Sequence, residues 1–105
     1  FRSNARIMGA KLMQGLQALE KRYAAVGDVR GMGLFLGVEL INPDGSEAAA
    51  ICKYVKNRMR DRRILIGSEG PKDNILKIRP PLTIDAQGVE MILSALGSIL
   101  AEVEP

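Results

Sequence analysis

The chain has 105 residues, with 15 Lys and Arg, 12 Asp and Glu, no His and one Cys. The absence of histidine excludes catalytic triads that use imidazole and histidine-based metal sites. The single cysteine, Cys52, excludes an intrachain disulfide and a thiolate zinc cluster. The composition, 47% hydrophobic and 26% charged, is ordinary for one globular domain. We also expect no apolar run near the roughly 18 residues that a membrane helix needs.

The N-terminal segment has the pattern of an amphipathic helix from Asn4 to Tyr23. Its apolar side chains recur at helical spacing, at Met8, Leu12, Leu16, Leu19 and Tyr23. The chain opens with Phe1 rather than Met, directly inside this pattern. We therefore expect it to be a piece of a longer protein.

The next segment, Gly33 to Leu40, has the pattern of a strand with one buried face. Its leucines and valine alternate, at Leu34, Leu36, Val38 and Leu40. The stretch from Val26 to Arg30 can pair with it across Gly31, which would make a hairpin.

A turn and a second helix follow. Asn42 to Gly45 reads Asn-Pro-Asp-Gly, a strong turn signal. Ser46 is then the predicted cap of a helix whose apolar stripe is Ala48, Cys52, Val55 and Met59. Residues 64–66 read as a short buried strand, and residues 67–74 as a loop.

The third strand pattern carries the best polar candidates. From Ile75 to Arg79 the residues alternate, so that Lys77 and Arg79 share one face before Pro80 and Pro81 close the strand. Beyond it, Thr83 is the predicted cap of a C-terminal helix, and Asp85 adds negative charge to its first turn. The apolar stripe of that helix is Val89, Leu93, Leu96, Leu100 and Val103.

The order of these elements predicts the fold class. Pairs of strands are interrupted by helices instead of alternating singly with them, which favours a mainly antiparallel sheet over a doubly wound fold. We predict an α+β fold, a single domain over residues 1–105. Its three- to four-stranded sheet has three helices packed on one face.

Lys77 and Arg79 are the candidate substrate-binding residues. A cation at a strand end can bind a carboxylate or phosphate, with arginine doing so through two parallel hydrogen bonds and lysine as a point charge. The alternative is that both are solvated residues on the open face of a half-buried sheet. No pair of carboxylates has a spacing that predicts acid–base catalysis, and the residues predict no catalytic residue, no cofactor-binding residue and no metal site.

Six basic residues cluster between Lys53 and Arg63, opposed only by Asp61. The cluster is typical of a solvated helix face, and the alternative is a surface for RNA or a phosphorylated partner. A regulatory domain that binds a small ligand on the sheet is a third possibility. The free Cys52 suggests a reducing compartment, the cytoplasm.

Two long motifs resemble a known family. Val26 to Leu40 reads VGDVRGMGLFLGVEL, and Asn74 to Thr83 reads NILKIRPPLT. Both, in this order, closely resemble the C-terminal segment of class III pyridoxal-phosphate-dependent aminotransferases. The segment around Asn4 to Leu12 is similar to the helix that precedes it in that family, so the resemblance covers nearly the whole chain.

The resemblance implies that this chain is the C-terminal small domain of a longer aminotransferase, likewise α+β. It implies that pyridoxal phosphate, the catalytic lysine and most phosphate contacts belong to a large domain of the same chain. This piece alone would then be inactive, bind no cofactor and help to close the cleft for a small-molecule amine. The parent is expected to be a homodimer without membrane or nucleic-acid partners.

One position departs from the family pattern. Many members have an arginine three residues before the Pro-Pro pair, where it receives the substrate carboxylate, and the matching residue here is Lys77. A similar lysine occurs in members that resemble ethanolamine-phosphate phospho-lyase, whose substrate carries a phosphate. The resemblance therefore implies that Lys77, with Arg79, meets an anionic group other than an α-carboxylate.

Overall fold

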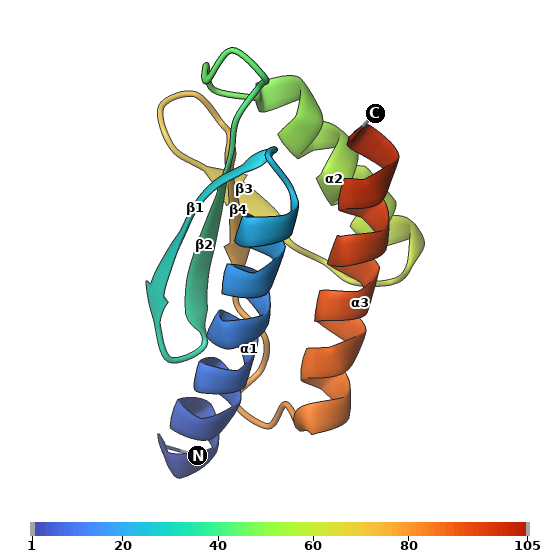
Figure 1. Cartoon of the computed structure of the whole chain (residues 1–105). Helices are drawn as coiled ribbons and strands as arrows, with labels where there is room; N and C mark the ends of the chain where they lie inside the picture. The colour runs from blue at the N-terminus through green and yellow to red at the C-terminus, as the bar shows by residue number, and fades with distance from the viewer. Residues whose placement is uncertain (1, 105) are drawn as a thin grey trace.

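The computed structural model describes residues 2–104 and has helices and strands in the predicted order (Figure 1). The elements are α1 (Arg2–Arg22), β1 (Val26–Met32), β2 (Phe35–Leu40), α2 (Ala49–Asp61), β3 (Gly67–Glu69), β4 (Ile75–Ile78) and α3 (Ala86–Val103). Arg79 follows the last residue of β4 instead of ending the strand itself.

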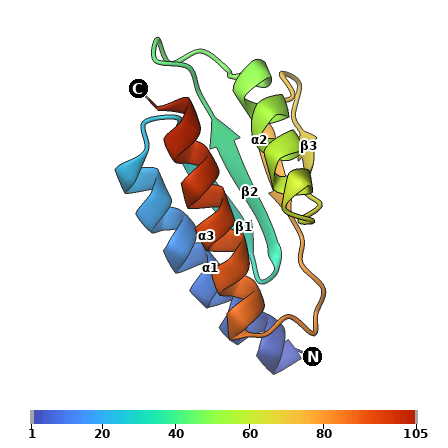
Figure 2. The same ribbon diagram turned by 90° about the vertical axis from the view of Figure 1, so that its right-hand side faces the viewer.

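The four strands form one sheet in the order β1-β2-β4-β3, and every neighbouring pair is antiparallel. Seen from the side, α1, α2 and α3 all lie on the same face of this sheet (Figure 2). Within residues 2–104 no helix lies on the opposite face, which we call the open face. The predicted fold class, α+β with a mainly antiparallel sheet covered on one face, is confirmed.

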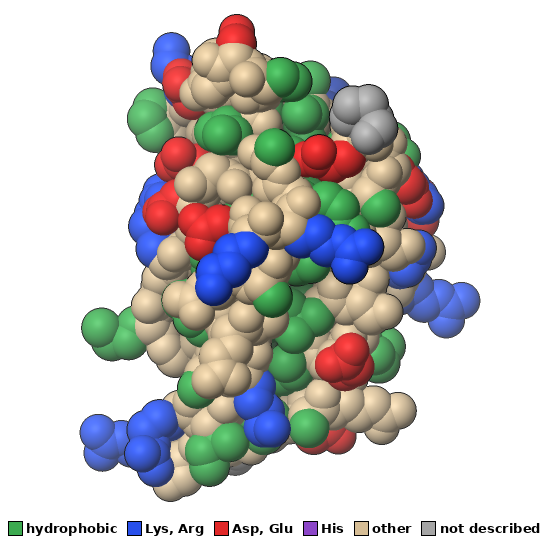
Figure 3. All heavy atoms as spheres, in the orientation of Figure 1, with side chains coloured by type: hydrophobic (Ala, Val, Ile, Leu, Met, Phe, Trp, Pro, Cys, Tyr) green, Lys and Arg blue, Asp and Glu red, His purple; other side chains and the backbone are tan. Residues whose placement is uncertain are grey.

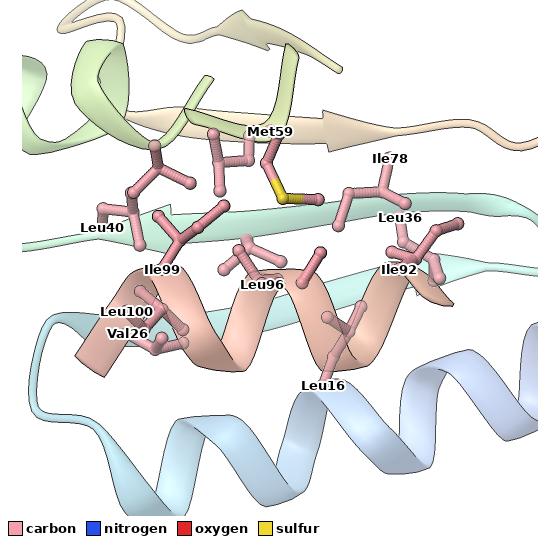
Figure 4. Packing of buried hydrophobic residues seen from close by; sticks show 14 of the residues in the cluster. Leu16, Val26, Leu36, Leu40, Met59, Ile78, Ile92, Leu96, Ile99 and Leu100 are labelled. Carbon is pink, nitrogen blue, oxygen red and sulfur yellow. The ribbon is translucent and has the colours of Figure 1, made fainter. Parts of the chain in front are cut away.

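The core lies between the helices and the covered face of the sheet (Figure 4). Leu36, Val38 and Leu40 of β2 are buried there, as the alternation predicted. In α3 the stripe is only partly as predicted, because Leu93 and Val103 are half-buried and Ile92, Ala95 and Ile99 are buried. The predicted stripe covered too narrow an arc, since α3 packs against both α1 and α2.

Helix α3 is also long and apolar enough, by length and composition alone, to cross a membrane. The expectation that no segment reaches that length is therefore not met. However, its buried residues, among them Leu96 and Leu100, supply the centre of the core. The same length and composition are found in the central helix of a globular domain.

The turn of the β1–β2 hairpin lies later in the chain than the sequence predicted. Met32 pairs with Phe35, so Gly33 and Leu34 form a two-residue turn, whereas the predicted strand started at Gly33. Gly33 has φ +57, the positive value that tight hairpin turns require. Gly9 of α1 packs directly against the backbone of Gly33, where an added Cβ would overlap with the turn. The glycine pair thus sets how closely α1 approaches the hairpin.

The predicted strand at residues 64–66 is wrong, and part of the predicted loop is a strand. Residues 64–66 have no strand structure, and Leu65 is 83% exposed. The end of α2 explains this, because Ile64 N–H still donates to Met59 O (3.0 Å) after Arg63 has turned to φ +63. The chain reaches the edge of β4 only at Gly67, where β3 begins.

Both predicted serine and threonine caps are also wrong. The Ser46 hydroxyl donates to Asp44 Oδ1 (2.6 Å) and stabilises the preceding turn, while α2 starts at Ala49 without a side-chain cap. The cap of α3 is Asp85, whose Oδ1 accepts from Gly88 N–H (2.8 Å). Asp85 therefore contributes an acceptor as well as the negative charge that the sequence suggested.

The close contact between Gly9 and the hairpin turn predicts that a larger residue at position 9 destabilises the protein. We expect Gly9→Ala to destabilise the protein by about 1–3 kcal/mol, because the added methyl group meets backbone that cannot move aside. Gly97→Ala in α3 is the matched control. There the methyl group meets only the flexible end of Leu19 at 3.3 Å, and alanine favours the helix by up to about 1 kcal/mol. Urea denaturation measures both, and equal effects would contradict the close approach.

The capping geometry makes a second prediction. Asp85→Ala is expected to cost about 0.5–2 kcal/mol of unfolding free energy, because Gly88 N–H loses its acceptor. Thr83→Ala removes the residue that the sequence pattern favoured and should leave the thermal midpoint nearly unchanged. A larger loss for Thr83→Ala than for Asp85→Ala, measured by thermal denaturation, would show that the cap is misplaced.

Candidate anion-binding site

Lys77 lies on the open face because its neighbours in β4 are buried. Leu76 and Ile78 point into the core, so the alternation of the strand turns Lys77 away from the helices. Its partners in the two adjacent strands are Gly37 of β2 and Gly67 of β3. Gly37 in turn pairs with Arg30 of β1, so the row that crosses the sheet is Arg30, Gly37, Lys77 and Gly67. The two glycines leave open surface on either side of Lys77.

Glu69 of β3 forms an ion pair with Lys77, with Nζ and Oε1 3.2 Å apart. The two residues are diagonal neighbours, since Gly67 pairs with Lys77 and Glu69 pairs with Ile75. The lysine stem passes over Gly67, whose missing side chain leaves the path clear. The side chains of Lys77 and Glu69 are 30% and 49% exposed, so the pair remains accessible to a solute.

Arg79 contributes the second predicted cation. The centre of its guanidinium lies 3.9 Å from the ring centroid of Phe35, which is a cation–π contact. Within residues 2–104, no acidic side chain forms an ion pair with Arg79. The structure thus brings the two predicted site residues to the same end of β4, with Glu69 as the neighbouring anion.

The apolar side chains of the open face differ in their exposure. Phe35 is 54% exposed, although one side of its ring meets Arg79. Ile75 is half-buried against the glycines beside it, Gly37 and Gly70.

A second charged group on the open face is already neutralised. Arg30 lies 2.7 Å from Asp28 and 3.4 Å from Glu39. The hydrogen bond to Asp28 is the main cause of a raised pKa for Arg30. Arg30 lies between two carboxylates, whereas Lys77 has one carboxylate partner and Arg79 has none within residues 2–104. Lys77 and Arg79 are therefore the better candidates for an anionic solute.

The basic cluster of α2 is divided among several partners. Lys56 donates to Ser68 Oγ (2.6 Å), Arg62 donates to Ser98 Oγ (3.0 Å), and Arg58 binds both carboxylate oxygens of Glu102 on α3. On the face shown in Figure 3, Lys and Arg side chains are scattered among Asp and Glu instead of forming one patch. This arrangement favours the solvated-helix interpretation over a nucleic-acid surface.

Cys52 is fully buried in the core, and burial raises the pKa of its thiol to about 11. A buried thiol with a raised pKa is a structural residue and a poor nucleophile.

Sequence reasoning missed Glu69, Gly37 and Gly67 as parts of the candidate site. Glu69 and Gly67 fell in a predicted loop, and a three-residue strand is too short to show an alternating pattern. A useful signal was available only with the strand register, because it alone places both glycines opposite Lys77.

The chain is similar to known proteins over nearly its whole length. The family model described as "Aminotransferase class-III" matches residues 1–100. An alanine–glyoxylate aminotransferase 2-like protein of Drosophila melanogaster is 32% identical over 110 residues, which cover 98% of this chain and 22% of that protein.

Two solved structures share the fold. A phospholyase from Arthrobacter in complex with phosphoethanolamine superimposes with a TM-score of 0.92 and is 35% identical, over 96% of this chain and 24% of that one. An amine transaminase from an uncultivated Pseudomonas species, in a form with bound pyridoxal phosphate, has a TM-score of 0.81 and 31% identity, over 96% and 23%. The chain belongs to the class III aminotransferase family and spans less than a quarter of the length of these relatives.

Pyridoxal phosphate is implied by this family, but the described residues do not form a site for it. The cofactor requires a lysine held in a desolvated pocket together with groups that bind its ring and phosphate. Every lysine in residues 2–104 is exposed or half-buried, and Lys77 is ion-paired with Glu69. No lysine of this chain is therefore assigned to the cofactor.

The contact between α2 and α3 makes a prediction about pH. Hydrogen bonds from Arg58, and then from Tyr54, hold the pKa of Glu102 at about 2, below its ordinary value of 4.5. A carboxylate whose pKa is lowered by folding stabilises the native state above its ordinary pKa and loses that contribution as it is protonated. The stability advantage of the wild type over Glu102→Gln should therefore be full at pH 7 and decrease between about pH 4.5 and 2.

Urea midpoints of the two proteins at several pH values measure this difference. Glu90→Gln, on the same helix, is the control and should show no comparable trend. A stability advantage of the wild type that stays constant down to pH 2 would contradict a stabilising role for the hydrogen bonds from Arg58 and Tyr54 to Glu102.

Proposed function

We propose that residues 1–105 are the C-terminal small domain of a longer pyridoxal-phosphate-dependent aminotransferase. The short coverage of its relatives and the family match along nearly the whole chain support this proposal. The open face of the sheet, where Phe35 is exposed, suits a surface that borders a cleft with a larger domain.

The parent enzyme transfers an amino group between an amine and a keto acid or aldehyde. When bound in the large domain, pyridoxal phosphate supplies the electron sink for that chemistry. The role of this chain is to bind and orient the substrate. Lys77 and Arg79 hold the anionic end of the amine at the border of the cleft.

The observation that carries the proposal is the position of Lys77 between two glycines, with Arg79 following on the same face of the sheet. A lysine is a compact point charge and lacks the flat fork with which arginine binds a carboxylate. We propose a phosphorylated amine as the substrate class, in keeping with the phosphoethanolamine complex of the similar Arthrobacter phospholyase.

We also propose that the parent is a homodimer in the cytoplasm. The reduced, buried Cys52 fits a reducing compartment, and the dimer follows from the family resemblance.

The proposal is tested by Lys77→Ala in the longer enzyme, produced from its full reading frame with pyridoxal phosphate bound. We expect KM for phosphoethanolamine to rise on the order of tenfold or more, since a charged hydrogen bond to the substrate is lost. Steady-state kinetics against several phosphorylated and carboxylated amines would identify the substrate class.

Lys72→Ala is the matched control, because Lys72 is an exposed lysine in the neighbouring β3–β4 turn. It should leave KM unchanged. An unchanged KM in Lys77→Ala would show that Lys77 does not bind the anionic group of the substrate.

A further inference from the structure

Phe35 and Arg79 lie opposite each other on the open face, at the end of the sheet where the β1–β2 turn lies. The register of β2 and β4 pairs Leu36 with Ile78, so the next residues outward are Phe35 and Arg79. The guanidinium carbon of Arg79 lies over the Phe35 ring, 3.9 Å from its centroid. The face of an aromatic ring is negative and attracts a cation held over it. The two residues therefore form a cation–π pair across neighbouring strands.

The Phe35 ring restrains a side chain that the strand itself leaves free. Arg79 follows the last residue of β4, and its side chain is exposed. Pro80 and Pro81 come next and have no N–H, so the strand cannot continue in the ladder beyond Arg79. Phe35, in contrast, is fixed within β2 by its pairing with Met32 beside the hairpin turn. The more rigid partner of the pair thus determines where the guanidinium lies.

The kind of partner determines what the guanidinium still offers to a solute. Arg30, on the same face, donates its N–H groups to the carboxylates of Asp28 and Glu39. Arg79 instead rests against a ring, and no acidic side chain within residues 2–104 forms an ion pair with it. A guanidinium stacked on a ring uses its flat face and keeps the N–H groups at its edge for hydrogen bonds.

The surface above Gly37 lies between this pair and Lys77. Gly37 is the next residue of β2 on the open face after Phe35, and it is opposite Lys77 in β4. Arg79 and Lys77 are two residues apart, which is roughly 7 Å along an extended chain. Lys77 must leave its ion pair with Glu69 to reach an anion above Gly37, whereas Arg79 is already held beside that surface.

We propose that Phe35 is a positioning residue of the anion site: its ring holds Arg79 on the open face with the guanidinium N–H groups free to bind the anionic group of the substrate. This inference deepens the proposed function and rests on Lys77 and Arg79 as the anion-binding residues. Phe35 acts through Arg79 and touches neither the anion nor the reacting atoms.

The test measures phosphoethanolamine with the longer enzyme, with pyridoxal phosphate bound. The binding constant is taken from KM or, where the compound is not turned over, from competitive inhibition against an amine substrate. Phe35→Leu keeps an apolar side chain and removes the ring, while Phe35→Tyr keeps the ring. Both are made with and without Arg79→Ala, so that a double-mutant cycle isolates the effect that passes through Arg79.

We expect Phe35→Leu to weaken phosphoethanolamine about twofold to fivefold, the range for an exposed cation–π contact. The kcat of the amine substrate should remain unchanged, because the ring acts on binding alone, and Phe35→Tyr should bind like the wild type. When Arg79→Ala is already present, Phe35→Leu should have no further effect. Met32→Leu is the control, because Met32 is exposed on the other side of Phe35, and it should alter nothing.

Two results would overturn the inference. An equal loss in Phe35→Leu with and without Arg79→Ala would mean that the ring supports the fold or borders the substrate directly. Unchanged or tighter binding in Phe35→Leu would mean that the contact does not present Arg79 to the anion.

A second variant decides the question if Phe35→Leu does not fold, judged by thermal denaturation. Phe35→trifluorophenylalanine keeps the size of the ring and removes the negative charge of its face. It should weaken phosphoethanolamine by the same factor as Phe35→Leu, since only the attraction to Arg79 is lost. Binding equal to that of the wild type would overturn the inference.

Failure of the proposed function gives a different result. In that case neither Lys77→Ala nor Arg79→Ala changes the binding constant of phosphoethanolamine. If Lys77→Ala weakens binding while Arg79→Ala or Phe35→Leu does not, the anion site stands on Lys77 and only the role of Phe35 is lost.

Discussion

The alternation of β4 is the constraint on which both the fold and the site depend. Leu76 and Ile78 must face the helices for the sheet to close its core, and the same geometry places Lys77 on the open face. A shift of one residue in register would bury the ammonium group and expose two core side chains. The hydrophobic core therefore determines the direction of the candidate binding residue without touching it.

Much of the fold could be predicted because long elements carry strong periodic signals. Helix α1 and strands β2 and β4 follow their apolar patterns closely. The failures have local causes. Leu65 is apolar yet exposed, since the end of α2 turns the chain before it reaches the sheet. Ser46 and Thr83 are good caps by residue type, but neighbouring aspartates determine the actual hydrogen bonds.

The site was predicted less completely than the fold, and for a physical reason. Lys77 and Arg79 are two residues apart, so their common face could be inferred within one strand. Glu69 meets Lys77 only through the register between β3 and β4, which is fixed by side chains elsewhere in the fold. The two cations could be predicted together because they follow one strand pattern. Their acidic neighbour, Glu69, could be identified only from the structure because it lies on another strand.

The two glycines beside Lys77 have different consequences for the site. At Gly37 an added Cβ would lie 3.3 Å from Ile75, so a side chain there would press on the neighbouring residue of β4. At Gly67 it would lie 4.0 Å from the lysine stem itself, in ordinary contact. A side chain at Gly67 would thus narrow the path between Lys77 and Glu69 without distorting the sheet. Gly37 keeps the sheet surface flat, while Gly67 keeps the ion pair within reach.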